Sequence, residues 1–377
     1  MKTLLVIGPE PPPVTGMEVA TRAMIEELRA AGVPLLRVDT ADPDDELGNR
    51  ARWTWHNVSL GLRHLLEAAR LSFRREVGAV YLPITQEYPG FYRDAAFILI
   101  ARLARKPVIV HLHGGAFARF VERESGWKRT LILETVGKAQ LGIVLSEALR
   151  FALECVLPPE KVVAVLNGLD LPRATVKRAD DGTVVVFFLS TLFVVKGILH
   201  FLEAFAQAHA ERPELRASVA GYWPDAETRA KAEALLDSLG IRHLVTFHGA
   251  VEGSRKSELF GLADIFCFPS IQTEGQPLVI IEAMAAGLPV VTSDGPGMDE
   301  LVVEGVTGLR VPIDQAALAG ALAGLAADPA ARAALGSAGR ERYETVFTRR
   351  AFGRRMLRAV GPFIGRPVTV EDERRAA

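Results

Sequence analysis

Two glutamates in the second half of the chain could bind a polar ligand. Glu282 lies in the run Leu278–Ala286 (LVIIEAMAA), which is apolar on every side apart from this carboxylate. A helix that is apolar all round is buried, and an ionised carboxylate inside it is unfavourable without partners. Its two oxygens suit two adjacent hydroxyl groups, such as a ribose diol. An ion pair with a distant arginine, or a position on a surface edge, are the structural alternatives.

A loop and a helix start precede Glu282. We predict a strand that ends at Phe268 and a loop that carries Glu274. Pro277 indicates the first helical position, because proline lacks an N–H group that would be unpaired there. The free N–H groups of the first turn and the helix dipole suit a phosphate. We therefore expect Glu274, which lies just before this helix, near a reacting sugar.

Short β-rich runs alternate with helical segments along most of the chain. In the first half we predict strands at 4–8, 35–40, 79–82, 108–113, 143–146 and 162–167, and helices at 19–31, 60–74, 95–105 and 128–138. After the polar stretch Pro172–Gly182, strands follow at 184–189, 217–221, 245–248, 265–268 and 290–293. Strands separated by helices imply parallel sheets, and ligands of such sheets bind beyond the carboxyl ends of the strands.

This alternation predicts an α/β fold of two Rossmann-like doubly wound domains that face a cleft. A chain of 377 residues is long enough for two such domains. We expect the first at residues 1–172 and the second at residues 173–349. The segment Ala316–Val360 is predicted to be helical throughout, and we expect the C-terminal helix, about residues 350–377, to pack back on the first domain.

The composition excludes several classes of protein. Hydrophobic residues make up 49% and charged residues 24% of the chain, and the net charge is -1. These values argue against a disordered chain and a nucleic-acid-binding polycation. Cys155 and Cys267 are too few for a disulfide framework or a cysteine-based zinc site. No signal peptide or membrane-spanning run is evident, so we expect a cytoplasmic protein without a nucleic-acid partner.

The spacing of Glu274 and Glu282 carries a family resemblance. The sequence FPS…EGQPLVIIEAMAAGLPVV, with seven residues between the two glutamates, resembles the donor signature of retaining GT-B glycosyltransferases of family 4, the glycogen-synthase-like group 1. The resemblance spans nearly the whole chain and is most specific from Phe188 to Pro312. Other segments that resemble this family are the strand and turn leading to Lys196, the strand and loop VTFHG ending at Gly249, the segment Asn167–Asp170, the histidine His113 in HLHGG, and the first loop Gly8–Gly16, which resembles that of members building bacterial surface polysaccharides.

This resemblance implies retaining transfer of a sugar from a UDP- or GDP-sugar to an acceptor hydroxyl, without a metal or another cofactor. The acceptor would be a carbohydrate, a lipid-linked molecule or a small molecule in polysaccharide or glycolipid assembly. Lys196 would bind the diphosphate, Glu282 the ribose, Glu274 the donor-sugar hydroxyls, and His113 the donor sugar or the acceptor side. The implied catalytic residues are His113, Lys196 and Glu274, and the implied donor-binding residues are Gly16, Thr191, Lys196, Gly249, Glu274, Gly275, Gln276, Leu278, Val279 and Glu282.

One position departs from the family pattern. Family members usually have an arginine five residues before the lysine, where this chain has Thr191. A lysine alone provides a compact charge without the fork of a guanidinium. We therefore expect stabilisation of the leaving diphosphate to depend more on Lys196 and the helix-start amides. The alternative is that an arginine from elsewhere, for example Arg255, occupies the space of the family's arginine.

Three further signals have two interpretations each. His113 precedes two glycines that let a ligand approach the backbone closely, although a lone histidine is more often structural. Asp42–Asp44 forms an Asp-x-Asp, the metal-binding emblem of another glycosyltransferase fold, and a solvated loop is the alternative. The segment Arg50–Arg75 carries arginines with tryptophans and leucines. It fits either peripheral contact with the inner face of the plasma membrane or a solvated helix that packs its leucines on the sheet.

Three other functions remain as hypotheses at this point. A sugar-nucleotide epimerase or hydrolase on the same fold would consume the donor without an acceptor. A non-catalytic sugar-nucleotide binding protein would bind the donor without turnover. A nicotinamide dehydrogenase is disfavoured, because the Gly8–Gly16 loop lacks the Gly-x-Gly-x-x-Gly pattern.

Overall fold

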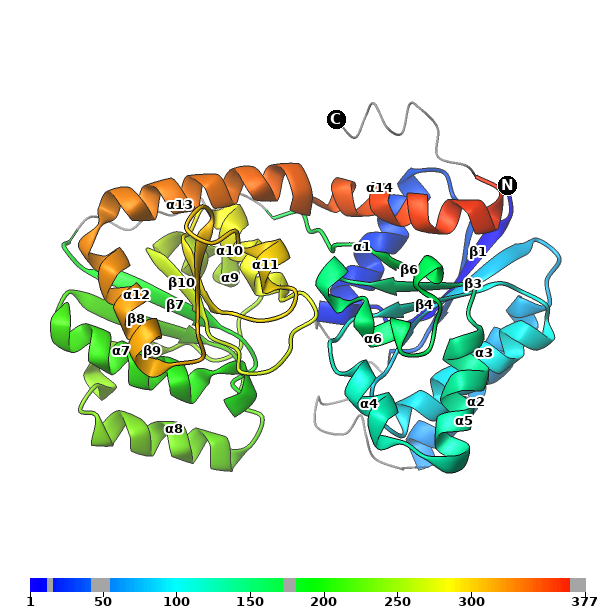
Figure 1. The fold of residues 1–377 in the computed structure, drawn as a ribbon, viewed down its shortest axis with the longest axis horizontal. Helices are drawn as coiled ribbons and strands as arrows, with labels where there is room; N and C mark the ends of the chain where they lie inside the picture. The colour runs from blue at the N-terminus through cyan, green and yellow to red at the C-terminus, as the bar shows by residue number, and fades with distance from the viewer. Residues whose placement is uncertain (12–15, 42–54, 172–180, 367–377) are drawn as a thin grey trace. The chain divides into compact units, whose positions relative to one another are not determined.

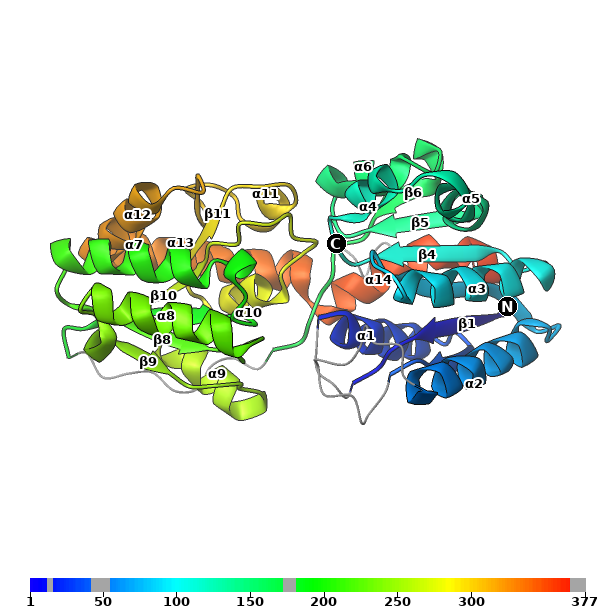
Figure 2. The same cartoon turned by 90° about the horizontal axis from the view of Figure 1, so that it is seen from below.

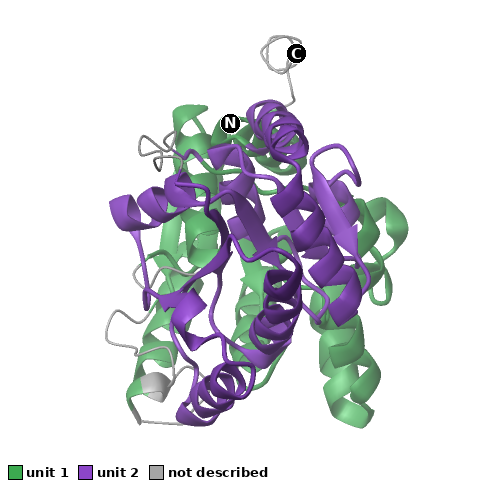
Figure 3. Cartoon of the chain, turned by 90° about the vertical axis from the view of Figure 1, so that its left-hand side faces the viewer, with its two compact units in different colours: residues 1–169, 348–377 green, residues 170–347 purple. Residues whose placement is uncertain are grey.

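The computed structural model describes residues 1–11, 16–41, 55–171 and 181–366. The chain forms two compact units, which Figure 3 shows in different colours. Unit 1 comprises Met1–Leu169 and Thr348–Ala377, and unit 2 comprises Asp170–Phe347. Each unit is a parallel six-stranded sheet covered by helices (Figure 1). The predicted α/β class is therefore confirmed, and the two units are doubly wound.

The sheet of unit 1 has the strand order β2-β1-β3-β4-β5-β6. The central strands β1, β3, β4 and β5 are buried along nearly their whole length, as expected when both faces of a parallel sheet are covered, whereas the edge strands β2 and β6 are partly exposed. The strand bounds are β1 (Thr3–Gly8), β2 (Leu35–Asp39), β3 (Val77–Ile84), β4 (Val108–Leu112), β5 (Leu141–Val144) and β6 (Val162–Ala164).

Helices cover both faces of this sheet. Figures 1 and 2 show α2, α3 and α5 side by side along one face, and α1 and α14 along the other. The helix α14 packs against α1 through a shared apolar cluster that includes Met24, Phe352 and Met356. The helices of unit 1 are α1 (Gly16–Ala30), α2 (Trp55–Ser72), α3 (Gly90–Leu103), α4 (Phe117–Arg123), α5 (Gly126–Thr135), α6 (Phe151–Glu154) and α14 (Arg349–Val360).

The sheet of unit 2 has the strand order β12-β11-β10-β7-β8-β9. Its strands are β7 (Val184–Leu189), β8 (Leu215–Ala220), β9 (Val245–Phe247), β10 (Ile265–Phe268), β11 (Val290–Ser293) and β12 (Gly308–Val311). Its helices are α7 (Ile198–Glu211), α8 (Ala226–Ser238), α9 (Gly253–Leu262), α10 (Leu278–Ala286), α11 (Met298–Leu301), α12 (Gln315–Ala327) and α13 (Pro329–Arg342). The helix α7 contributes three large side chains to the core between α7, α12 and the sheet, namely Phe201, Leu202 and Phe205. Leu199 of the same helix packs against the margin of this core.

Most predicted elements are present, and three details differ. The strand β12 was not predicted, because its four residues include a glycine and an arginine, and the helix α4 was not predicted, because its seven residues show too little periodicity. The segment predicted to be helical throughout is interrupted at Asp328 and Thr348, whose side chains cap the following helices. Residues 172–180 of the predicted linker lie outside the described residues. No helix in the described part of the chain is long and apolar enough to cross a membrane.

Candidate active site

The order of strands in unit 2 reverses between β7 and β10. From this pair the chain winds outward to β8 and β9 on one side, and to β11 and β12 on the other. Ligands of doubly wound sheets bind at such a reversal, beyond the carboxyl ends of the strands. Lys196 follows β7 in the short 3₁₀ turn η4 (Val194–Lys196), and Glu274 follows β10. The fold therefore places both predicted residues at the position where this architecture binds ligands.

Close backbone packing holds the two loops together. Gly197 has a φ of 86°, and a Cβ at this position would lie 2.0 Å from the carbonyl oxygen of Pro269. The N–H of Ile271 donates to the carbonyl of Val195 at 3.0 Å, and Ser270 Oγ lies 3.3 Å from the same carbonyl oxygen. Only glycine combines this backbone angle with this approach. Gly197 thus allows the loop after β7 to lie directly against the loop after β10.

Lys196 and Glu274 form an ion pair in this arrangement. Lys196 Nζ lies 2.8 Å from both carboxylate oxygens of Glu274. Ser270 Oγ donates to Oε1 at 2.6 Å, and Gln272 Nε2 donates to the same oxygen at 3.2 Å. The Glu274 side chain is buried, whereas Lys196 retains 24% exposure. Several donors therefore fix the carboxylate, and the ammonium group keeps access to solvent.

Glu282 lies in α10 and is paired with a lysine. Lys256 Nζ, on α9, lies 2.5 Å from Glu282 Oε1. Burial raises the pKa of Glu282, and the nearby charge and hydrogen bond of Lys256 partly oppose this rise. The two side chains line a small pocket together with Leu171, Ser257, Phe260, Ala285 and Ala286. The buried position of Glu282 is confirmed, and an ion pair, one of the structural alternatives, is present with a lysine in place of an arginine.

Lys256 was missing from the predicted site. The helical spacing of four residues places it on the same face of α9 as Phe260, which is buried. That periodicity would have indicated a lysine directed toward the core, but it does not identify the partner 26 residues later. The neighbouring Arg255 instead pairs with Glu258 at 2.7 Å and is half-exposed.

The start of α10 follows Glu274 directly. Pro277 is the N-cap and Leu278 the first helical residue, so the predicted position of the proline is wrong by one residue. Its ψ of 110° is extended, which places it outside the helix. Gly275 and Gln276 are buried, and Leu278 and Val279 are half-buried. A proline N-cap has no side-chain acceptor for the first amides of the helix, which leaves them suited to an anion.

The remaining predicted residues of unit 2 also lie in loops after its strands. Thr191 follows β7, and its carbonyl accepts a hydrogen bond from the N–H of Phe193 at 2.8 Å. Gly249 follows β9, and its carbonyl accepts from the N–H of Gly221 at 2.8 Å. Gly221, with a φ of 140°, would place a Cβ 1.7 Å from the Ser190 carbonyl oxygen. The loops after β7, β8 and β9 are thus in contact at one edge of the sheet.

His113 follows β4 in unit 1 and packs against a second histidine. The ring centroids of His111 and His113 are 4.0 Å apart, and Tyr81 Oη lies 2.7 Å from His111 Nδ1. Burial lowers the pKa of His113 to about 4. Burial, and secondly the charge of His113, lower the pKa of His111 well below its ordinary value. Both rings are therefore neutral near pH 7, and neither Nε2 atom has a hydrogen-bond partner among the described residues.

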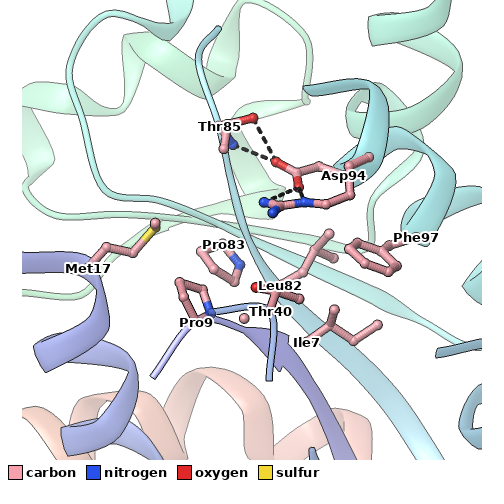
Figure 4. A pocket seen from close by; sticks show the side chains of 11 residues that line it. Ile7, Pro9, Met17, Thr40, Leu82, Pro83, Thr85, Asp94 and Phe97 are labelled. Carbon is pink, nitrogen blue, oxygen red and sulfur yellow. Dashed lines mark hydrogen bonds and ion pairs between the residues drawn. The ribbon is translucent and has the colours of Figure 1, made fainter. Parts of the chain in front are cut away.

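Unit 1 contains its own pocket where the strand order reverses between β1 and β3 (Figure 4). Asp94 is buried there and accepts hydrogen bonds from the N–H and Oγ1 of Thr85, each at 2.8 Å. Arg93 donates to the same carboxylate at 3.2 Å through two nitrogens. Gly16 begins α1, and Met17 beside it lines this pocket. The other lining residues include Ile7, Pro9, Thr40, Leu82, Pro83 and Phe97.

Comparisons with known proteins agree with this architecture. The family model described as glycosyl transferases group 1 matches residues 174–342. An MMP alpha-(1->4)-mannosyltransferase of Mycolicibacterium hassiacum is 29% identical over 289 residues, which cover 75% of this chain and 64% of that protein. An alpha-D-kanosaminyltransferase of Streptomyces kanamyceticus is 24% identical over 348 residues, which cover 78% and 86%. Residues 174–342 of the chain are thus similar to the group 1 glycosyltransferases.

The similarity to solved structures concerns the fold alone. The crystal structure of Anabaena HepE in complex with UDP and glucose has a TM-score of 0.73 and 19% identity, and the match covers 96% of this chain and 100% of that one. The fold is therefore GT-B. The chain spans 64% of the length of the mannosyltransferase and 42% of each of two further curated relatives.

The structure brings some predicted site residues together. Lys196 and Glu274 are in direct contact, and Glu282 lies on the helix that begins just after Glu274. His113 and Gly16 belong to unit 1. Asp42–Asp44 and the first part of Arg50–Arg75 lie outside the described residues. Among the residues that the structure describes, no group of three or more His, Cys, Asp or Glu side chains could hold a metal ion.

Proposed function

We propose that this chain transfers a glycosyl group from a nucleoside diphosphate sugar, such as a UDP- or GDP-sugar, to an acceptor hydroxyl with retention of configuration. One observation carries the proposal. The contact between Lys196 and Glu274 lies at the reversal point of the second sheet and directly precedes the start of α10. A cation, a sugar-binding carboxylate and free helix-start amides are the groups that a diphosphate sugar requires.

The diphosphate would bind between Lys196 and the first amides of α10. Lys196 is partly exposed, so its ammonium group can exchange one partner for another without being buried alone. In this structure that partner is Glu274. When a phosphate takes the ammonium group, hydroxyl groups of the donor sugar would donate to Glu274 in its place. The residue that first neutralises Lys196 thus becomes the acceptor for the sugar.

The ribose would bind at Glu282. Oε1 of its carboxylate accepts from Lys256, and Oε2 and the remaining lone pairs can accept hydrogen bonds from a diol. The positive charge of Lys256 favours the ionised form of the Glu282 carboxylate. In this form the carboxylate accepts hydrogen bonds and donates none. We infer that Lys256 keeps Glu282 charged and oriented for the ribose.

The proposed reaction replaces one bond at the anomeric carbon by another on the same face. The bond from that carbon to the leaving phosphate oxygen breaks, and the acceptor oxygen forms the new bond. The acceptor proton passes to the leaving phosphate. Negative charge grows on the departing diphosphate, and Lys196 and the helix-start amides stabilise it, which is the largest expected catalytic contribution. Neither a metal ion nor another cofactor takes part in this scheme.

The acceptor would bind in unit 1. Its pocket at the β1–β3 reversal contains the guanidinium of Arg93, which the buried Asp94 orients, beside apolar side chains. This small pocket can take one polar group of a carbohydrate or lipid-linked acceptor in polysaccharide or glycolipid assembly, and Arg93 would donate a hydrogen bond to it. His113, neutral near pH 7, can accept or donate one hydrogen bond through Nε2 to the donor sugar or the acceptor.

Calorimetric titration with UDP and with GDP tests the division of roles. Glu282→Ala should weaken binding of the preferred diphosphate, because the ribose loses its acceptor. Glu274→Gln should tighten binding of the free diphosphate by about fivefold, since it removes the group that competes for Lys196, a pair worth about 1 kcal/mol at partial exposure. Glu233→Gln, which changes an exposed carboxylate on α8, is the control. Equal losses in both site variants would contradict the assigned roles.

Product analysis distinguishes transfer from the alternatives. A transferase releases the diphosphate much faster with its acceptor than with donor alone. Equal release with and without any acceptor would indicate a hydrolase, and conversion of the donor into an isomer would indicate an epimerase. Binding without release under every condition would indicate a sugar-nucleotide binding protein.

A further inference from the structure

The exposed large apolar side chains of unit 1 gather on one layer of helices. On and just after α2, Leu62, Leu66 and Phe73 are 57%, 65% and 63% exposed. On α3, Leu99 and Leu103 are 41% and 75% exposed. We call these five residues the α2–α3 surface. The solvated-helix interpretation of this segment is correct for Leu65 and Leu71, which contact the core, and wrong for Leu62 and Leu66.

The α2–α3 surface lies on two neighbouring helices of that layer. Leu62, Leu66 and Phe73 follow the spacing of one helical face, as do Leu99 and Leu103. The helices α2 and α3 contact each other on the same side of the sheet, with α5 next to α3 (Figures 1 and 2). On α5, the 65% exposed Trp127 stacks on Tyr92 of α3, with ring centroids 6.0 Å apart. The layer thus continues from the leucines to an exposed tryptophan.

Basic residues border the α2–α3 surface. Arg63 and Arg70 are exposed on α2, about a quarter of a turn away from the apolar stripe. Further cations are Arg102 in the last turn of α3 and, after the two helices, Arg74, Arg75 and Arg105. Lys106 is not counted among them, because its ammonium group donates to the backbone carbonyls of Arg74 and Val77. Against these six basic residues, the only acidic residues from 56 to 76 and from 99 to 106 are Glu67 and Glu76. Because the whole chain has a net charge of -1, this positive charge is a local property of the layer.

We propose that the α2–α3 surface binds an anionic lipid bilayer, with its apolar side chains in the headgroup region and the arginines on lipid phosphates. An apolar stripe beside a basic stripe is the pattern of helices that lie in a membrane interface. Arginines near an anionic surface each contribute to attraction. A second copy of the chain meeting the same face would bring like charges together, which disfavours a dimer through this surface.

This proposal goes beyond the glycosyl transfer and does not depend on it. A protein held on a bilayer by one face of unit 1 has access to acceptors anchored in that bilayer. The contact would be peripheral, and the cytoplasmic leaflet is the anionic surface that it fits.

Vesicle flotation tests the proposal without any assay of activity. The full chain is mixed with vesicles of phosphatidylcholine alone or of equimolar phosphatidylcholine and phosphatidylglycerol. We expect binding to the anionic vesicles only, and loss of binding when salt near 1 M shortens the screening length to about 3 Å. Leu62→Ser/Leu66→Ser/Phe73→Ser should weaken partitioning by about tenfold or more. Arg63→Gln/Arg70→Gln should weaken it by about fivefold for each charge removed.

The matched control is Leu239→Ser/Val306→Ser/Ile313→Ser, which removes three exposed apolar side chains from unit 2. It should bind vesicles like the unchanged protein. Thermal unfolding checks that each variant folds, and if the first triple variant melts early, the arginine variant decides. The proposal is overturned if the unchanged protein ignores anionic vesicles, or if both surface variants bind like the control. Sedimentation that shows a dimer lost in the surface variants would assign the surface to a second copy.

Discussion

Replacing Lys256 by methionine should leave the carboxylate of Glu282 buried without its counter-ion. Methionine keeps an unbranched apolar chain of similar length, so the main change is the lost charge. Removing one partner of a buried ion pair costs about 3–5 kcal/mol. Here the Glu282 carboxylate can instead bind a proton, and the free energy of this protonation sets an upper limit on the loss of stability. From an ordinary pKa of 4.5, protonation at pH 7 costs about 3.4 kcal/mol, at about 1.36 kcal/mol per pH unit.

The expected loss at pH 7 is therefore about 2–3 kcal/mol, because water that reaches the pocket beside Lys256 also lowers the penalty. The sign follows from the raised pKa of Glu282. A carboxyl group whose pKa is raised on folding stabilises the folded state less as pH rises. In Lys256→Met the opposing effect of the lysine is gone, so the pKa rises further. At pH 5 protonation costs at most about 0.7 kcal/mol, and the loss should shrink accordingly.

Urea unfolding followed by circular dichroism at pH 7 and pH 5 measures this difference. The matched background is Glu282→Gln, in which no buried charge is left behind. There Lys256→Met should cost less than about 1 kcal/mol at both pH values. A loss in the unchanged background that is as large at pH 5 as at pH 7, or an equal loss in the Glu282→Gln background, would refute the reasoning.

Three further predictions concern catalysis, metals and acid stability. Lys196→Ala should lower kcat by about a hundredfold or more, with a smaller effect on donor binding, because the leaving-group charge grows toward the transition state; pre-steady-state donor titration separates the two effects. Transfer should survive excess chelator, and recovery of lost activity by manganese would instead favour the Asp42–Asp44 hypothesis. Since the pKa of His113 falls from 6.5 to about 4 on folding, the unfolded chain binds more protons between these values, so stability should decrease as pH falls through this window. His113→Gln should flatten that decrease in pH-dependent urea unfolding, and an unchanged slope would exclude His113 as its source.

The sequence predicts the sheets well because each strand is a short apolar run between turn signals. Val184–Leu189, Ile265–Phe268 and Val290–Ser293 have the same bounds in the structure as in the prediction. The order of these strands follows from topology, which residue patterns indicate only through general rules of winding. The strand Gly308–Val311 was not predicted, because its four residues include a glycine and an arginine. Short edge strands depend on pairing with a neighbour, here β11, more than on their own propensity.

The sequence predicts which residues belong to the candidate site, but it does not predict which of their side chains contact each other. The positions of Glu274 and Glu282 are fixed along the chain by one loop and one helix. Their partners Lys196 and Lys256 come from 78 and 26 residues away, so only the folded sheet shows which lysine meets which glutamate. The contact of Lys196 also depends on Gly197, whose close approach to Pro269 is a property of two loops together. Pairing of this kind has no periodic signal in the sequence.

The two lysine–glutamate pairs suggest how the site can discriminate between ligands. Each lysine already has a carboxylate partner. The binding free energy of a ligand is therefore only the difference between its own contacts with the site and the ion pair that it replaces. A diphosphate with its sugar satisfies both sides of the pair at Lys196, because the phosphate takes the ammonium group and the sugar hydroxyls take Glu274. A free diphosphate leaves Glu274 buried with fewer donors, although Ser270 and Gln272 still contact it. Within the proposed function, this difference favours the intact donor over the released product. The pairing of Lys196 with Glu274 would therefore also promote release of the diphosphate product.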